Sequence, residues 1–127
     1  MPHIVFEATK AMANAVDFPA LLRTIHDRFH ERGYAPVAAI RSRVVVLDAA
    51  LSGGDADEQF VIATMRTTVA RRPEMEEAMA QVIHDALRAA IAESGYAGPW
   101  QCGVFREYVP GERYIKSSGG KPQGLTV

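Results

Sequence analysis

Apolar positions along this chain follow two spacings, one typical of strands and one typical of helices. β-branched and aromatic residues gather in four short runs, which predict strands over residues 3–8, 37–47, 59–69 and 100–108. Between them, apolar side chains recur every three or four positions and predict helices over residues 18–32 and 73–94. The predicted order is strand, helix, strand, and then the same order again.

Residues that start and stop helices bound both predicted helices. Asp17 can cap the first helix, and Gly33 ends it. Pro73 suits the first turn of the second helix, which Gly95 ends. The polar stretch between the first strand and Asp17 predicts no element of its own.

The repeated order predicts an α/β (α+β) fold with one domain, residues 1–115, in two βαβ halves over about 1–55 and 56–115. Because βαβ crossovers are right-handed, both helices should cover the same face of one four-stranded sheet. The Gly-, Ser- and Pro-containing residues 116–127 predict a flexible tail.

The other face of this sheet is expected to lack a cover. We expect it to carry alternate apolar residues drawn from Ile4, Phe6, Val45, Phe60, Ile62 and their neighbours. Such a surface is too apolar for a monomer to leave in water, and it predicts oligomerisation.

Composition narrows the classes of function. The 127 residues include 14 Lys or Arg against 15 Asp or Glu, so the chain lacks the basic excess that favours nucleic-acid binding. The N-terminal residues do not resemble a signal peptide, and no membrane association is expected. The single cysteine, Cys102, cannot form an internal disulfide and fits a cytoplasmic location.

Two arginines stand out in the second predicted strand. Arg41 and Arg43 are two positions apart and should project from the same face. They are either solvated residues of an exposed edge or a carboxylate clamp, because a guanidinium matches a carboxylate with two parallel hydrogen bonds. A substrate with two or three carboxylates would suit the clamp.

Pro2 is a second candidate. Most prolines at this position have no chemical role, but removal of Met1 would expose a secondary amine. Terminal amines have reference pKa values near 7.7 to 8.0, and burial beside cations would favour the neutral form. Pro2 could then act as a general base.

Other chemical patterns in the chain are weaker. His26 and His30 have the i, i+4 spacing of zinc-protease helices, but the third ligand is unspecified and two surface histidines are the simpler interpretation. Cys102 reads as a small packed side chain, and Arg71 and Arg72 as solvated residues before the second helix. We therefore expect neither a metal site nor a cofactor.

With Pro2-His3-Ile4-Val5-Phe6-Glu7 at the start and Ile40-Arg41-Ser42-Arg43 in the second strand, the sequence resembles the tautomerase superfamily. Within it, the resemblance is to the 5-carboxymethyl-2-hydroxymuconate isomerases. It implies a cofactor-free homotrimer in which Pro2 is the catalytic base and Arg41 binds a substrate carboxylate, with Arg43 in the same block. Related 4-oxalocrotonate tautomerases have another arginine after the first strand, where this chain offers only Lys10.

The implied activity is isomerisation of an unsaturated 2-hydroxy or 2-oxo di- or tricarboxylic acid in aromatic-acid catabolism. Two alternatives remain open. One is a Pro-dependent decarboxylase or hydratase of the same fold. The other is a ferredoxin-like module that binds a small ligand without turnover, since that fold shares the element order.

Overall fold

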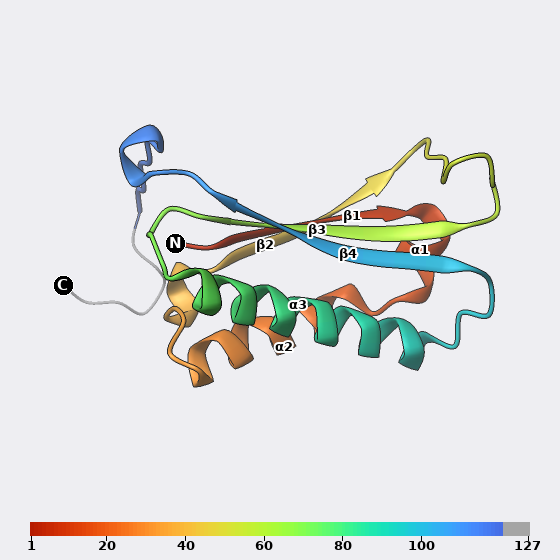
Figure 1. Cartoon of the computed structure of the whole chain (residues 1–127), viewed down its shortest axis with the longest axis horizontal. Coiled ribbons are helices and arrows are strands. Elements are labelled where there is room, and N and C mark those ends of the chain that lie inside the picture. The colour runs from red at the N-terminus through yellow and green to blue at the C-terminus, as the bar shows by residue number, and fades with distance from the viewer. Residues whose placement is uncertain (121–127) are drawn as a thin grey trace.

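Four strands form one mixed sheet, and two long helices cover one of its faces (Figure 1). In this computed structural model, which describes residues 1–120, the elements are β1 (His3–Thr9), α1 (Lys10–Ala15), α2 (Phe18–Glu31), η1 (Val37–Ala39), β2 (Arg41–Leu47), β3 (Gln59–Thr67), α3 (Pro73–Ser94), β4 (Trp100–Tyr108) and η2 (Gly111–Arg113). The strand order is β2-β1-β3-β4. The parallel pairs β1–β2 and β3–β4 meet in an antiparallel β1–β3 pair, which confirms the predicted fold class.

The start of β2 differs from the prediction. Val37–Ala39 form a short 3₁₀ turn, and the strand begins at Arg41 rather than at residue 37. The edge strand β2 pairs only with β1, whose first residue, His3, lies opposite Arg41. Residues 37–40 therefore have no strand beside them to pair with. In the same way β3 ends at Thr67 rather than at residue 69.

Both predicted helices are present, with the expected ends. The Asp17 carboxylate accepts a hydrogen bond from the Ala20 amide at 3.1 Å, which caps α2. Gly95 ends α3 in the left-handed region, with φ of 72°, where glycine has no steric penalty. Helix α1 was missed because six residues are too few to show a helical period, although its Met12 is fully buried.

The sheet face under α2 and α3 forms the core. Ile4, Phe6, Val61, Ala63 and Met65 are fully buried on it. The expectation that Ile4 and Phe6 lie on the uncovered face is therefore wrong. Alternation within one strand is local, but which set faces the helices depends on packing between distant segments.

The uncovered face of the sheet carries the alternate residues of each strand, those that point away from the helices. Register places Val5, Val45, Ile62 and Phe105 on this face, with Phe60 in phase, and Phe105 is 67% exposed. At the end where β1 begins, this open face becomes strongly charged. The residues there are His3, Arg41, Arg43, Arg66 and Glu107.

Two further findings concern the ends of the chain and its helices. The predicted tail, residues 116–127, reaches beyond the described residues; residues 116–119 have neither helix nor strand. Within residues 1–120, every helix is too short or too polar to cross a membrane.

Candidate active site

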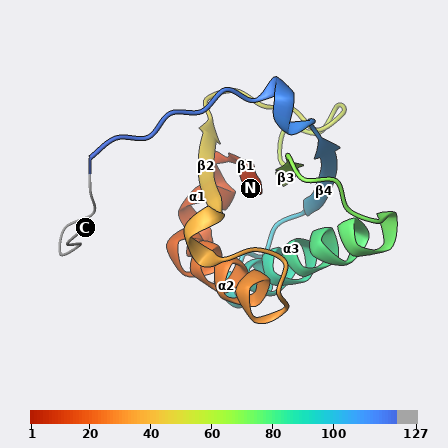
Figure 2. The ribbon, with the colours of Figure 1, turned by 90° about the vertical axis from the view of Figure 1, so that its left-hand side faces the viewer.

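Pro2 lies at the charged end of the sheet. It is buried, directly before β1, and its carbonyl accepts a hydrogen bond from the Arg41 amide at 3.1 Å. Seen end-on, the N-terminus lies inside a ring formed by β2, α2, the start of α3 and the segment after β4 (Figure 2). The parallel β1–β2 pairing thus brings together residues 39 positions apart, Pro2 and Arg41.

The terminal amine of Met1 lies next to Pro2 and is partly buried among cations. It donates a hydrogen bond to Thr68 Oγ1 at 3.2 Å. Partial burial, together with the cations of Arg71 and Lys116, lowers the pKa of this amine from its usual value of 8.0. With Met1 in place, the Pro2 nitrogen is an amide and has no basic lone pair.

The Arg41 side chain is held by backbone groups. Its Nη1 donates to the carbonyl of Ala38 at 2.8 Å and to that of Ile40 at 3.1 Å. A guanidinium has five N–H donors, so most of them remain for a ligand. The exposed Arg41 side chain is thus restrained by these two carbonyls and keeps donors for a ligand.

Arg43 projects from the same face of β2, as predicted. Its Nη1 lies 3.1 Å from Nδ1 of His3, and Nε2 of His3 lies 3.4 Å from the Tyr114 hydroxyl. Burial, followed by the cations of Arg43 and Arg41, lowers the pKa of His3 from its usual value of 6.5. The sequence analysis assigned neither His3 nor Tyr114 to the site. The two residues are 111 positions apart, so no local pattern indicates their contact.

Arg71 also belongs to this site, and its interpretation as a solvated residue is wrong. It donates to the carbonyl of Val69 at 3.1 Å and to that of Tyr34 at 3.2 Å, and it is only partly exposed. Arg72 is solvated as expected and faces Glu74. Lys10 pairs with Asp48 beyond the far end of β1, a strand about 23 Å long by its rise per residue. Arg71, and not Lys10, therefore supplies a further cation near the N-terminus.

A family model describes chains of this kind. The model for 5-carboxymethyl-2-hydroxymuconate isomerase matches residues 2–97. The chain belongs to the 5-carboxymethyl-2-hydroxymuconate isomerase family. The matched region contains Pro2, His3, Arg41, Arg43 and Arg71, whereas Tyr114 and Lys116 lie outside it.

Several solved structures have a similar fold. A 5-carboxymethyl-2-hydroxymuconate isomerase from Deinococcus radiodurans R1 matches with a TM-score of 0.79 and 19% identity, over 93% of this chain and 90% of that one. A 5-carboxymethyl-2-hydroxymuconate delta-isomerase matches with a TM-score of 0.70 and 18% identity, over 94% and 89%. A fused 4-OT protein described as a symmetric trimer matches with a TM-score of 0.63 and 16% identity, over 98% and 94%. No curated protein sequence matches significantly.

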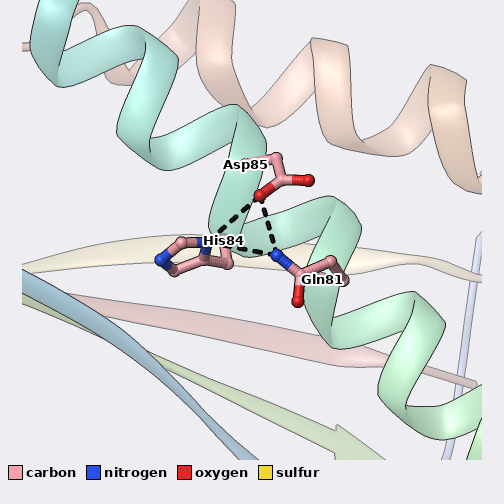
Figure 3. Close-up of polar contacts among 3 residues, drawn as sticks. All are labelled: Gln81, His84 and Asp85. Carbon is pink, nitrogen blue, oxygen red and sulfur yellow. Dashed lines mark hydrogen bonds and ion pairs between the residues drawn. The ribbon is translucent and has the colours of Figure 1, made fainter.

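Among the remaining histidines, His26 contacts the covered side of β2, while His30, His84 and Cys102 have no contact with the candidate site among the hydrogen bonds of residues 1–120. His26 Nε2 lies 2.6 Å from the Ser42 hydroxyl, and His30 is exposed. On α3, His84 contacts Gln81 and Asp85 at the helix surface (Figure 3). Within residues 1–120, no three His, Cys, Asp or Glu side chains form a group that could hold a metal. Burial raises the pKa of the Cys102 thiol, as it does for a packed and unreactive cysteine.

A groove in the helix layer is also separate from the site. It encloses about 460 Å³ between α2 and α3, and its lining includes Ala20, Arg28, Ala86 and Glu93. In this chain the candidate groups Pro2, Arg41 and Arg43 thus lie at the end of the sheet where β1 begins and not in the helix layer.

Proposed function

We propose that the chain is a cofactor-free isomerase that moves a proton within an unsaturated 2-hydroxy or 2-oxo acid. The observation that supports this most directly is the buried Pro2, whose carbonyl accepts a hydrogen bond from the Arg41 backbone amide and which directly follows the amine whose pKa Arg71 lowers. Removal of Met1 would convert the Pro2 nitrogen into an amine in an environment that disfavours its charged form. The family match, which begins at residue 2, agrees with this assignment.

The proposed reaction is a proton transfer within one molecule of substrate. The neutral Pro2 amine removes a proton from the substrate, and the resulting dienolate carries negative charge. Arg41 binds a carboxylate and stabilises this charge through charge-assisted hydrogen bonds. The protonated amine then returns the proton to a different carbon, so the enzyme ends in its starting state.

An ultraviolet assay tests the proposal directly. Protein whose intact mass lacks Met1 should interconvert 2-hydroxymuconate-type dienols and their keto forms well above the rate in buffer. Absence of turnover, with binding retained, would favour the non-enzymatic ligand-binding module. Release of CO₂ or uptake of water would instead favour the decarboxylase or hydratase.

The pH dependence should respond to Arg71. Arg71 lowers the pKa of the Met1 amine, one residue before Pro2. Removing this cation in Arg71→Gln should make the charged form of a free Pro2 amine less unfavourable and so raise its pKa. Because turnover needs the neutral amine, activity is lost as pH falls through that pKa. The acidic limb of the kcat/KM profile should therefore move to higher pH.

Arg72→Gln is the matched control for this profile, since Arg72 is exposed and, within residues 1–120, forms an ion pair only with Glu74. Its profile should coincide with that of the unchanged protein. A profile of Arg71→Gln that also coincides, in protein that unfolds at the same temperature, would contradict a role of Arg71 in lowering the amine pKa.

We also propose that the open face is the contact between three copies of the chain. Phe105 and Val45 on this face are 67% and 46% exposed, which is unusual for a surface left in water. The fused 4-OT protein of similar fold is described as a symmetric trimer.

Light scattering should give the mass of three chains, and Phe105→Asp on the open face should lower this measured mass. The exposed Met75→Ala on α3 should leave it unchanged; a monomeric mass at micromolar concentration would contradict the trimer.

A further inference from the structure

His3 joins two segments at the charged end of the open face. Arg43 Nη1 lies 3.1 Å from one ring nitrogen, Nδ1, and the Tyr114 hydroxyl lies 3.4 Å from the other, Nε2. The rings of His3 and Tyr114 also meet edge to face, with centroids 5.8 Å apart. Both ring nitrogens of His3 are thus occupied within the described part of the chain.

These contacts indicate which ring nitrogen of the neutral His3 imidazole carries the proton. A guanidinium can only donate, so Nδ1 of His3 must accept and carry no proton. The proton then lies on Nε2, which donates to the Tyr114 hydroxyl. The charged groups that face His3 are Arg43, Arg41, Arg66 and the terminal amine, all cations, and the Glu107 carboxylate is paired with Arg66. Every unpaired charge around His3 therefore favours the neutral ring.

We propose that His3 is a positioning residue that holds the Arg43 guanidinium for the second carboxylate of a dicarboxylate substrate. This inference rests on the proposed function, in which Arg41 holds the first carboxylate. Arg43 is exposed, and only His3 restrains its guanidinium among the hydrogen bonds of residues 1–120. Restraining a long side chain before the ligand arrives reduces the rotamer freedom lost on binding.

The spacing of the two arginines defines the class of ligand. Arg41 and Arg43 are two residues apart on one strand, so their Cα atoms lie about 6.6 Å apart. This separation suits two carboxylates at the ends of one small extended acid better than two contacts to a single carboxylate. His3 itself has no free ring nitrogen to act as a base, so its effect on the reaction passes through Arg43.

Two His3 variants separate its functions. His3→Phe keeps an aromatic ring against Tyr114 but removes the acceptor for Arg43. His3→Asn places Oδ1 close to the position of Nδ1 and keeps that acceptor. With a dicarboxylate 2-hydroxydienoate, His3→Phe should raise KM by up to about tenfold, the cost of ordering one freed long side chain on binding, with kcat nearly unchanged. His3→Asn should restore KM, and a monocarboxylate 2-hydroxydienoate should show no change in either variant.

A second arm tests whether the effect passes through Arg43. In an Arg43→Ala background, His3→Phe should change KM for the dicarboxylate no further, because the residue it positions is absent. Equal loss of kcat with both substrates, failure of His3→Asn to restore KM, or additive effects in the double variant would each overturn the inference.

A binding arm keeps this inference distinguishable from the proposed function. If the unchanged protein converts neither substrate, the isomerase proposal fails, and calorimetry with the unreactive acids adipate and hexanoate decides the role of His3. Tighter binding of adipate that His3→Phe abolishes supports the inference; equal binding of the two acids overturns it. Nitrogen NMR of the free protein should show the proton of His3 on Nε2, and a proton on Nδ1 would overturn it as well.

Discussion

Protein that retains Met1 is expected to lose about a hundred- to ten-thousand-fold in kcat/KM relative to protein that begins at Pro2, the usual contribution of a general base. The reason is the nitrogen itself. As an amide, the Pro2 nitrogen has no basic lone pair, so it cannot remove a proton from the substrate. The Met1 amine lies one residue away, hydrogen-bonded to Thr68.

The comparison can be made within one preparation. Protein with Met1, verified by intact mass, is assayed before and after treatment with methionine aminopeptidase. Pro2→Ala, freed from Met1 in the same way, keeps an amine but loses the rigid ring, so its rate should fall between those of the two forms. Full activity of the form that retains Met1, before and after acetylation of its amine, would rule out Pro2 as the base.

Arg41→Ala is expected to lower kcat/KM for a dicarboxylate dienol by about 10- to 150-fold, the equivalent of one charge-assisted hydrogen-bonding group. Most of the loss should appear in KM, because the carboxylate is bound in the substrate as well as in the transition state. Arg41→Lys should recover only part of it. An ammonium keeps the charge, but it cannot form the paired hydrogen bonds of a guanidinium.

Arg72→Ala is the charge-matched control for Arg41→Ala, since it also removes one exposed arginine of the chain. Its kinetics should stay within about twofold of the unchanged protein, because salt screens a distant exposed charge. The backbone bond from the Arg41 amide to Pro2 does not depend on the side chain, so Arg41→Ala should keep its fold and its mass in solution. Unchanged KM in such folded protein would remove Arg41 from the binding site.

Local patterns in the sequence were sufficient for most of the fold. Period-two runs and i, i+3, i+7 spacing identified all four strands and both long helices, and Asp17 and Gly95 marked helix ends correctly. The errors lie where a neighbour decides the conformation. Val37 and Ile40 favour strands, yet residues 37–40 form no strand, because β1 begins at His3 opposite Arg41 and has no earlier residue to pair with them.

The residues of the candidate site also fall into two groups, those that the sequence identified and those that it did not. Pro2, Arg41 and Arg43 could be chosen from the sequence, because residue type and spacing along one strand carry the signal. Lys10 was the only sequence candidate for a further cation, and it lies at the far end of β1. Arg71 offered no local signal, since its place beside the N-terminus results from the turn after β3 folding back toward Tyr34.

The sequence by itself determined the order of the elements, the ends of the helices and the chemical groups on offer, because these depend on residues within a turn or two of one another. Tertiary structure alone decided which phase of each strand faces the helices, which put Ile4 and Phe6 in the core and left Phe105 on the open face. It also brought His3, Arg43 and Tyr114 together. Side chains up to 111 positions apart meet only through strand register and packing. The local spacing of apolar residues predicts neither of these.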